Sequence, residues 1–382
     1  MSAGVDHAAL RERARALGAD HATRVDALDE VESARAAVAV LSEAGLTRWC
    51  VPARDGGADT GGAVPVEAVS VCALRTLRDE LAWHSAMLDV MLVMQGLGSY
   101  AVALGGSEAL RGDVFPGVLN GEAIAAFGLT EPGAGSSLAD VATKAVRQGD
   151  GWVLDGHKTF ISNCGIARFY TVLARTSGEP GEKGGLSMFF VPADAFGVEA
   201  EPFEVIAPHP IGDVRLHGVE LPGEFLLGEE GAGQELALAV LARFRTSVAA
   251  AANGFARRAL FESLEHLQRR QQFGRPLSSF QGLRFDLAEM DVRLRAAQLL
   301  VDEAAERMDA GDLDADHSVA RAKLFATEAA GWICDRAVQH HGGLGVKRGT
   351  MVERLYRDVR SLRIYEGTSE VQKLILAGKL LA

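Results

Sequence analysis

Residues 152–162 read WVLDGHKTFIS, a run rich in β-prone side chains within an otherwise alanine-rich chain. Two similar runs follow, FYTVLART at residues 169–176 and LSMFFVPA at residues 186–193. The segments beside them, GDG, SGEPGEKGG and PADAFG, consist mainly of turn residues. Short β-prone runs separated by turn signals are typical of antiparallel strands. The sequence therefore predicts a small antiparallel β domain, a barrel or sandwich, over residues 121–230.

Both flanks of this region have helical spacing. Before it, VESARAAVAVLSEAG at residues 31–45 repeats small and apolar residues with a helical period, and Gly45 is placed to end the helix. After Gly233, three long helical stretches and a shorter final segment are typical of antiparallel four-helix packing. The predicted fold is α+β, with an all-α domain at residues 1–120, the β domain at 121–230 and a helical bundle at 231–382.

The composition argues against several classes of function. The 382 residues carry a formal charge of −12 without long blocks of one sign, which argues against nucleic-acid binding. The four cysteines are scattered and form no CxxC pair, so neither disulfides nor a metal site is predicted. The N-terminal stretch mixes charges, unlike a secretory signal, and the apolar run at residues 87–106 is broken by Asp89, Gln95 and glycines. We expect a cytoplasmic protein that does not bind membranes.

Short motifs carry the candidate chemistry, and each is ambiguous by itself. FGLTEPGAGSS, residues 127–137, frees backbone N–H groups that could hold a phosphate or a ring edge, although a plain surface turn is the simpler interpretation. RRQQFGRP at residues 269–276 and QHHGGLG at residues 339–345 also fit ordinary helix ends. RIYEGTSEVQ, residues 363–372, places one glutamate between a tyrosine and a glycine. Neither a dinucleotide-binding fingerprint nor a P-loop occurs.

Taken in order along an α–β–α chain, these motifs resemble those of the acyl-CoA dehydrogenases. The resemblance covers almost the whole chain and is strongest in FGLTEPGAGSS, WVLDGHKTFISNCG, RRQQFGRPLSSFQ, AVQHHGGLG and YRDVRSLRIYEGTSEVQ. It implies an FAD-dependent enzyme of fatty acid metabolism that oxidises an acyl-CoA thioester to the trans-2-enoyl thioester. It also implies an electron-transfer flavoprotein as the electron acceptor, and a homodimer or homotetramer.

The resemblance assigns residues to the cofactor and to the substrate. The residues implied to line the flavin ring are Phe127, Leu129, Thr130, Ser136, Phe160, Ile161 and Ser162. Those implied to contact the FAD diphosphate and adenine, partly across a subunit boundary, are Arg270, Gln272, Phe273, Gln281, Gln339, Gly342 and Gly343. Thr368 and Glu370 complete the implied cofactor site. The residues implied to contact the substrate are Ser136, Arg245, Tyr365 and Gly367.

Glu366 is the catalytic base that the resemblance implies. Forming the double bond requires a carboxylate that removes the α-proton while a hydride leaves the β-carbon, and we expect burial to raise the pKa of Glu366. Gly367 lets the backbone come close, so that the Glu366 N–H can polarise the thioester carbonyl. Isovaleryl- and long-chain-type relatives carry their base on the long helix, where this sequence has Phe244. The pattern is therefore that of the medium- and short-chain-type enzymes.

Two departures from the family pattern concern the thioester carrier. The chain reads VIAPHPIGDVRLHGVELPG where relatives have a segment with arginine and serine, and Gly378 stands where an arginine is usual. The first alternative is therefore a dehydrogenase of acyl chains bound to a carrier protein. Comparing the activity on CoA thioesters with the activity on carrier-bound thioesters would distinguish the two enzymes. An oxygen-using flavoenzyme and a non-catalytic scaffold of the same fold are further alternatives. Glu366 argues against the oxygen-using flavoenzyme, and intact flavin motifs together with Glu366 argue against the scaffold. Acyl chain length stays open.

Overall fold

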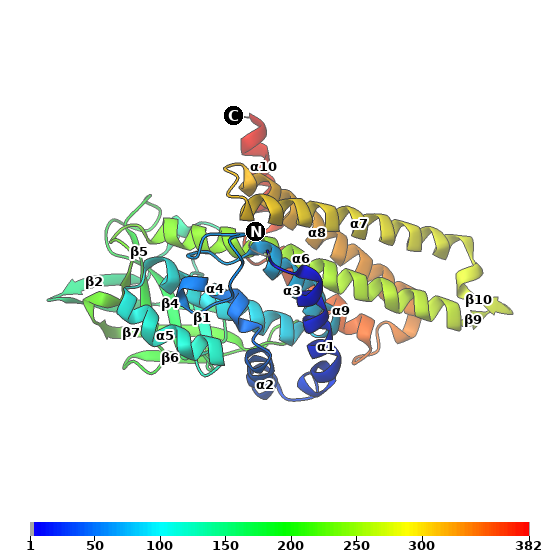
Figure 1. Ribbon diagram of the computed structural model, residues 1–382, viewed down its shortest axis with the longest axis horizontal. Helices are drawn as coiled ribbons and strands as arrows, with labels where there is room; N and C mark the ends of the chain where they lie inside the picture. The colour runs from blue at the N-terminus through cyan, green and yellow to red at the C-terminus, as the bar shows by residue number, and fades with distance from the viewer. Residues whose placement is uncertain (1–3, 382) are drawn as a thin grey trace. The chain divides into compact units, whose positions relative to one another are not determined.

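The computed structural model describes residues 4–381 (Figure 1). Positions 1–3 and 382 lie outside the described residues. Positions 1–3 begin the predicted first domain and the N-terminal stretch that is unlike a secretory signal, and position 382 ends the predicted last domain. Helices come first, strands follow and helices return, so the predicted α+β order is confirmed. The described chain divides into two compact units. The β unit comprises residues 4–6, 19–70 and 90–244, and the helical unit comprises residues 7–18, 71–89 and 245–381.

The N-terminal part of the chain is helical, as predicted. Its α-helices are α1 (His7–Val25), α2 (Glu30–Glu43), α3 (Val71–His84), α4 (Ala86–Gly105) and α5 (Glu108–Asn120). Asp29 caps α2, because its side chain accepts hydrogen bonds from the N–H groups of Val31 and Glu32 at 3.1 and 3.0 Å. Gly45 has a φ of +67° just after this helix, which confirms the predicted helix stop.

Helix α4 is long and apolar enough to cross a membrane by length and composition alone. In the structure, however, 89% of its apolar window is buried, which is the pattern of a core helix. Gln95 on this helix donates hydrogen bonds to the carbonyls of Val118 and Ala123 at 3.1 and 3.0 Å, and its side-chain oxygen accepts one from Ala125 N–H at 3.1 Å. Gln95 thereby fixes the first residue of strand β1 (Ala125–Gly128).

The β unit is built around one sheet (Figure 1). Its other strands are β2 (Lys144–Gln148), β3 (Gly151–Ser162), β4 (Phe169–Arg175), β5 (Leu186–Pro192), β6 (Val198–Pro202), β7 (Ile211–Leu221) and β8 (Leu226–Leu227). The order across the sheet is β6-β7-β3-β2-β4-β5-β8, and β1 pairs with β4. The predicted antiparallel sheet is thus mixed, because β1 and β2 run parallel to β4. The β2–β3 hairpin lies between β1 and β4 in the chain. This connection is long enough for β4 to run parallel to β1.

Apolar side chains fill the interior of the β unit. Trp152 on β3 and Phe189 on β5 are fully buried and pack edge to face, with ring centroids 5.3 Å apart. The predicted GDG turn is the tight β2–β3 hairpin, in which Gly149 has a φ of +59°. These contacts hold β3, whose last residues belong to the candidate site.

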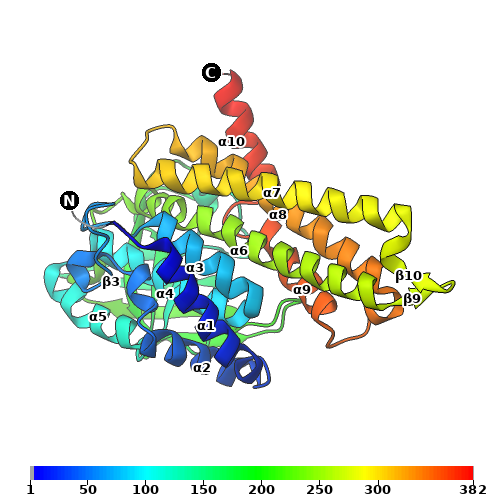
Figure 2. The ribbon, with the colours of Figure 1, turned by 45° about the vertical axis from the view of Figure 1, so that its right-hand side comes forward.

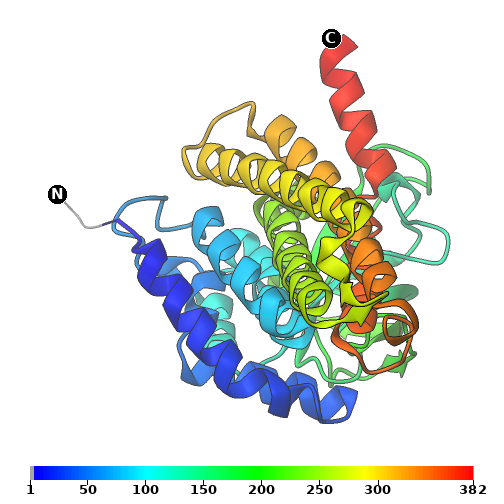
Figure 3. The ribbon, with the colours of Figure 1, turned by 90° about the vertical axis from the view of Figure 1, so that its right-hand side faces the viewer.

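The helical unit contains the long helices predicted after Gly233 (Figures 2 and 3). The helices of this part of the chain are α6 (Gly233–Arg269), α7 (Gln281–Asp309), α8 (Ala315–His341), α9 (Met351–Arg360) and α10 (Ser369–Leu381). Alanine dominates the core of this unit, so its helices approach closely. The predicted fourth member, α10, packs against α8. A hairpin of β9 (Gln271–Gln272) and β10 (Arg275–Pro276) joins α6 to α7.

Short 3-10 helices complete the described chain. They are η1 (Thr47–Cys50), η2 (Ala53–Asp55), η3 (Leu138–Asp140), η4 (Gly223–Phe225), η5 (Leu277–Ser279), η6 (Gly342–Leu344) and η7 (Ser361–Arg363). Two of them matter for the candidate site, because η6 lies in the QHHGGLG motif and η7 leads into the turn that carries Glu366.

Candidate active site

The predicted flavin-lining turn, residues 127–136, follows strand β1 directly. Phe127 and Leu129 belong to the buried core of the β unit, whereas Thr130 is half-buried and Ser136 is exposed. A Cβ added to either glycine within residues 132–135 would meet open space. The exposed half of the turn therefore presents main chain that a ligand can approach closely.

A buried ion pair that is not among the predicted site residues holds this turn on the sheet. The Glu131 carboxylate lies 2.7 Å from Lys158 Nζ and accepts hydrogen bonds from Ala142 and Thr143 N–H at 2.7 and 3.0 Å. Lys158 also donates to the Leu129 carbonyl at 3.1 Å. Burial lowers the pKa of Lys158 to about 8, although Glu131 opposes this shift. The sequence could have indicated this pair, because both residues lie in motifs that carry the family resemblance.

The end of β3 turns one aromatic ring outward. The register between β3 and β7 shifts between Lys158 and Ile161, and at this bulge Phe160 has a φ of +54° and is 61% exposed. Thr159 N–H donates to the Thr130 carbonyl at 2.9 Å, so the exposed ring belongs next to the glycine-rich turn. A left-handed conformation costs a bulky residue about 1–3 kcal/mol. A strained, exposed ring beside an open turn fits a flat ring ligand such as a flavin, whereas Ile161 is buried in the core.

His209 holds the hydroxyl of Ser162, and it too is absent from the predicted site. Nε2 of His209 lies 3.1 Å from Ser162 Oγ, and Nδ1 lies 3.0 Å from the Ala207 carbonyl. A carbonyl only accepts, so Nδ1 carries the proton and Nε2 accepts the hydrogen bond from Ser162. Burial lowers the pKa of His209 and keeps the ring neutral. The HPIG segment, which departs from the family pattern, was the feature of the sequence that could have indicated His209. The structure connects this segment to Ser162, a predicted flavin-lining residue.

The predicted base, Glu366, lies in a left-handed turn between η7 and α10. Glu366 and Gly367 have φ angles of +52° and +89°. Arg245 Nε donates to the Glu366 carbonyl at 2.9 Å. Lys323 Nζ and Gln372 Nε2 donate to the Gly367 carbonyl at 2.6 and 3.0 Å. Side chains from α6, α8 and α10 therefore hold the strained main chain that carries the carboxylate.

The Glu366 carboxylate has the properties of a general base. Its Oε2 is buried and has no hydrogen-bond partner within residues 4–381. Burial raises the pKa of Glu366, and the charges of Arg78, Arg245 and Lys323 oppose this shift. Burial also lowers the pKa of Lys323 to about 8. A shielded, unpartnered carboxylate with a raised pKa is suited to take up a proton near neutral pH.

A buried ion pair contributes to the electrostatics of Glu366. Arg78 Nε and Nη2 donate to the two carboxylate oxygens of Asp89 at 2.8 and 2.7 Å, and Nη1 donates to Ser247 Oγ at 3.1 Å. The Arg78 charge interacts with Tyr365 and Glu366. Neither Arg78 nor Asp89 is a predicted site residue. The signal was an acidic residue inside an apolar run, since a buried carboxylate requires a cationic partner.

The neighbours of Glu366 in the sequence have distinct roles. Tyr365 is 37% exposed, yet desolvation of its hydroxyl raises its pKa. Thr368 Oγ1 accepts a hydrogen bond from Val371 N–H at 3.2 Å and so caps the start of α10. Glu370 is exposed in the first turn of this helix. The structure thus brings the predicted substrate residues Arg245, Tyr365 and Gly367 to one turn with Glu366.

The other predicted residues of the helical unit lie at the far end of α6 (Figure 2). They are Arg270 after α6, Gln272 and Phe273 in the hairpin, Gln281 at the start of α7, and Gln339, Gly342 and Gly343 at the end of α8. His266 and His341 stack with ring centroids 4.2 Å apart and join the ends of α6 and α8. Arg245 and Arg270 are 25 residues apart, about 38 Å along a helix. Within one copy, these candidates therefore form two separate groups.

Phe244, at the alternative base position, is fully buried in the β unit. Its ring packs edge to face against Tyr100, with centroids 5.6 Å apart. A Cβ on Gly96 would approach the Phe244 ring to 2.4 Å, so the two positions are tightly matched. A solvent-shielded aromatic position of this kind supplies no base.

Comparisons with known proteins identify relatives of this chain over all three of its parts. Residues 5–122, 126–219 and 231–381 match the family descriptions "Acyl-CoA dehydrogenase, N-terminal domain", "middle domain" and "C-terminal domain". The 3-(aryl)acrylate reductase of Clostridium sporogenes is 39% identical over 80% of this chain and 82% of its own length. The caffeyl-CoA reductase-Etf complex subunit CarC of Acetobacterium woodii is 36% identical over 79% of this chain and 80% of its own length.

Solved structures extend the similarity to the whole chain. The butyryl-CoA dehydrogenase of Megasphaera elsdenii has a TM-score of 0.88 and 29% identity, with 99% of both chains covered. The predicted fold class and the predicted family are confirmed. The chain, which joins N-terminal helices, a middle sheet and C-terminal helices, belongs to the acyl-CoA dehydrogenase family of oxidoreductases.

Proposed function

We propose that this flavoenzyme oxidises an acyl-CoA thioester to the trans-2-enoyl thioester, with FAD as its cofactor and Glu366 as its base. The observation that supports this most strongly is the buried, unpartnered Oε2 of Glu366 on a turn that three side chains hold. FAD, when bound, supplies the acceptor for the hydride that leaves the β-carbon. The protein supplies the base, the orientation and the exclusion of water.

Each residue of the Glu366 turn has a proposed task. Glu366 Oε2 takes the α-proton, and the Glu366 N–H polarises the thioester carbonyl. Gly367, at φ +89°, leaves space for this approach. Arg245 and Lys323 hold the turn and favour the ionised carboxylate before proton transfer. Ser136 and Tyr365 complete the proposed substrate contacts.

The direction of the reaction is part of the proposal. Two similar proteins are named as reductases, and a third is named as a dehydrogenase. A base that removes an α-proton in one direction returns it in the other, so the same residues serve both. We assign the oxidative direction, as the name of the butyryl-CoA dehydrogenase states for that protein.

The proposed FAD contacts comprise two groups of residues. The flavin-lining group is Phe127, Leu129, Thr130, Ser136, Phe160, Ile161 and Ser162, and the exposed Phe160 ring beside the open turn supports it. The group for the diphosphate and adenine is Arg270, Gln272, Phe273, Gln281, Gln339, Gly342 and Gly343, with Thr368 and Glu370 near the base. Phe273, at φ +53° and 90% exposed, supports a ligand or partner at the far end of α6.

We further propose a homodimer or homotetramer. The two residue groups of the helical unit are about 38 Å apart along α6, so the hairpin group is available to the cofactor of a second copy. On α7, Phe285, Val292 and Leu299 recur every seven residues and are all exposed. Such an apolar stripe on one helix face is typical of a surface that packs against another chain.

The proposed electron acceptor is an electron-transfer flavoprotein. The name of the similar CarC subunit places that protein in a complex with Etf. We place the enzyme in the cytoplasm and in fatty acid metabolism. All four cysteines are free thiols, which fits a reducing compartment.

A carrier-protein thioester is the second candidate substrate. Gly378, which stands where an arginine is usual, lies exposed on α10 with open space around its Cα. This position offers no side chain to a CoA nucleotide. If that contact is dispensable, a pantetheine thioester should be oxidised almost as efficiently as the CoA thioester, whereas a loss of several hundredfold would show that the nucleotide is recognised.

Anaerobic titration of the purified yellow enzyme tests the proposed function. A panel of acyl-CoA, acyl-pantetheine and acyl-carrier-protein thioesters is added, and the flavin absorbance is followed. At least one saturated thioester should bleach the flavin and yield the 2-enoyl product, whereas the matching free acids should not. Flavin that dithionite reduces but no acyl thioester reduces would contradict the proposal.

A further inference from the structure

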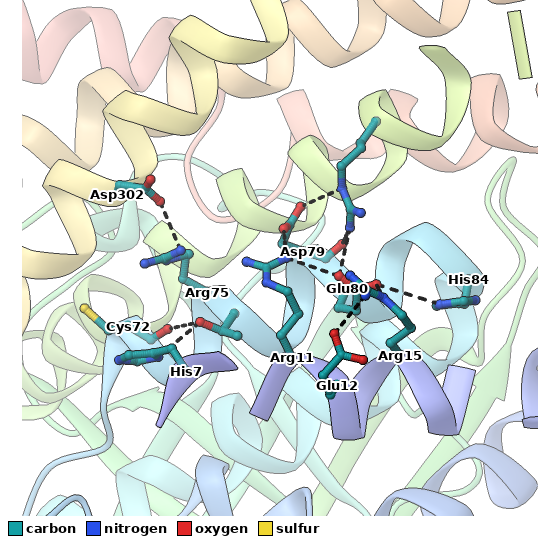
Figure 4. Close-up of polar contacts among 12 residues, drawn as sticks. His7, Arg11, Glu12, Arg15, Cys72, Arg75, Asp79, Glu80, His84 and Asp302 are labelled. Atoms are coloured by element: carbon teal, nitrogen blue, oxygen red, sulfur yellow. Dashed lines mark hydrogen bonds and ion pairs between the residues drawn. The ribbon is translucent and has the colours of Figure 1, made fainter. Parts of the chain in front are cut away.

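The helical unit contains a polar pocket away from the proposed cofactor and substrate residues. Its volume is about 270 Å³, and helices α1, α3, α6 and α7 contribute its walls. Four arginines, two aspartates, an asparagine and a glutamine line it, together with one alanine and one valine. Figure 4 shows the ion pairs that Arg11 and Arg15 make with Glu80 and the pair between Arg75 and Asp302. None of the lining residues belongs to the sites proposed above.

The lining carries an excess of positive charge. Among the lining residues, four arginines (Arg11, Arg75, Arg257 and Arg295) stand against two aspartates (Asp79 and Asp302). This excess is local, because the whole chain has a formal charge of −12. An arginine-rich pocket on an acidic protein attracts anions against the average field of the surface.

Some of these arginines are already neutralised (Figure 4). Arg11 Nη1 lies 2.8 Å from Asp79 and 3.1 Å from Glu80, which is just behind the lining. Arg257 Nη2 and Arg15 Nε lie 3.2 and 3.0 Å from the same glutamate. Burial alone would raise the pKa of Glu80, but Arg257, Arg15 and Arg11 hold it below its ordinary value. Glu80 is therefore ionised at neutral pH, and with Glu12, 2.8 Å from Arg15, the group contains three arginines and three carboxylates.

Two other arginines of the lining retain uncommitted donors. Arg75 Nη1 lies 3.1 Å from Asp302 Oδ1, yet its Nε is buried without a hydrogen-bond partner in the described chain. Arg295 is exposed at the rim, and residues 4–381 offer its side chain no ion pair. Two guanidinium groups, from α3 and α7, are thus available to one ligand.

A buried amide also points to a ligand. Asn253 on α6 lines the pocket and is only 3% exposed, and its Oδ1 has no hydrogen-bond partner among the described residues. Buried amides are almost always hydrogen-bonded, because an unmet polar group in the interior is costly. A ligand that carries a hydroxyl or other donor next to its anionic group would meet both Asn253 and the arginines.

We propose that this pocket binds a compact oxyanion, either a small organic acid or inorganic phosphate, through Arg75 and Arg295. Guanidinium groups pair with carboxylate and phosphate oxygens through two parallel hydrogen bonds, which suits both sources. The lining holds no aromatic ring to stack on a base, and the volume is too small for a whole dinucleotide, so CoA and FAD are not its ligands. The bound anion bridges α3 and α7 and so stabilises the helical unit.

Thermal unfolding of the purified holoenzyme tests the site. Phosphate and malate, an organic acid that carries a hydroxyl, are titrated separately, with sodium chloride at matched ionic strength as the reference. The Tm should rise with one of the two anions, and above the Kd it should rise with the logarithm of the anion concentration, as binding to the native state requires. Arg295→Gln, a substitution at the pocket rim, should weaken the apparent Kd by about tenfold or more. Arg321→Gln, at an exposed arginine on α8 outside the pocket, should leave the Kd unchanged.

The remaining outcomes decide between the sources or reject the site. A rise in Tm beyond that in chloride with phosphate alone, or with malate alone, identifies the ligand class. A Tm that rises equally with chloride shows general charge screening and overturns the proposal. An unchanged Kd in Arg295→Gln overturns it as well. Arg75→Gln should act in the same way as Arg295→Gln, and the exposed position of Arg295 keeps the test valid if Arg75→Gln does not fold.

Discussion

Arg245 Nε donates a hydrogen bond of 2.9 Å to the main-chain carbonyl of Glu366. The residue that follows Phe244 in the chain therefore holds the turn that carries the proposed base. The bond joins α6 to a residue in the left-handed conformation, which is costly for glutamate. Arg245 acts on the main chain of Glu366 and, through its charge, on the carboxylate.

Arg245→Met should slow reduction of the flavin by substrate by about tenfold or more, because a turn with about 1–3 kcal/mol of strain loses a donor. FAD content should not change. The Arg245 charge lowers the pKa of Glu366, so its loss should move the acidic limb of the rate profile to higher pH. Stopped-flow reduction across the pH range measures both effects. The same rate and the same limb as in Arg321→Gln would argue against this role.

Lys323 should give a pH-dependent contribution to stability. Burial lowers the pKa of Lys323 from 10.5 to about 8, so between these values the unfolded chain binds the extra proton. The free energy of unfolding contributed by this residue therefore rises with pH in that window and is constant below it. Urea unfolding of the wild type and of Lys323→Met, compared below pH 8 and within the window, measures the difference. If the difference in the free energy of unfolding stays constant or falls as the pH rises through the window, the result would contradict a buried Lys323 amine with a lowered pKa.

His209→Ala should weaken FAD binding by about tenfold or less, because one hydrogen bond of about 0.5–1.5 kcal/mol that fixes Ser162 is lost. Fluorescence titration of the apoprotein with FAD measures the Kd. The matched control is His217→Ala, because His217 lies on β7, shortly after His209 in the chain, and is exposed with its Nε2 3.8 Å from Glu199. Equal affinities in both variants would leave His209 without a role at the flavin.

Arg270→Ala should lower the FAD occupancy of the purified protein, since an exposed guanidinium after α6 is placed to bind a diphosphate by charge-assisted hydrogen bonds. The neighbouring Arg269 pairs with Glu265 and serves as the control. The ratio of flavin to protein absorbance reports occupancy. Full and tightly held FAD in Arg270→Ala would remove this residue from the cofactor site.

The sequence predicts the elements better than it predicts the links between them. WVLDGHKTFIS forms β3 as expected, and Gly45 follows the end of α2 as expected. The outward turn of Phe160 was not predictable, because it depends on the register between β3 and β7, some fifty residues further along. The parallel pairing of β1 with β4 is a long-range contact of the same kind.

Most of the residues at the candidate site that the motifs did not predict belong to buried ion pairs. Glu131 and Lys158 look like surface residues in a sequence, since charged side chains are mostly exposed. Only the fold shows that they neutralise each other in the interior. Glu366 was identified through the family resemblance, whereas its unpartnered Oε2 and the donors that hold its turn are properties of the folded chain.

The rate at which substrate reduces the flavin in Glu366→Gln tests the central claim most directly. Glutamine preserves the size of the side chain but cannot accept the α-proton, so FAD should remain bound while reduction by a good acyl thioester slows by about 10²–10⁴-fold. Glu306→Gln, at an exposed glutamate on α7, should react like the wild type. Anaerobic stopped-flow absorbance gives both rates. A Glu366→Gln enzyme that keeps more than about a tenth of the wild-type rate would contradict the assignment of Glu366 as the base.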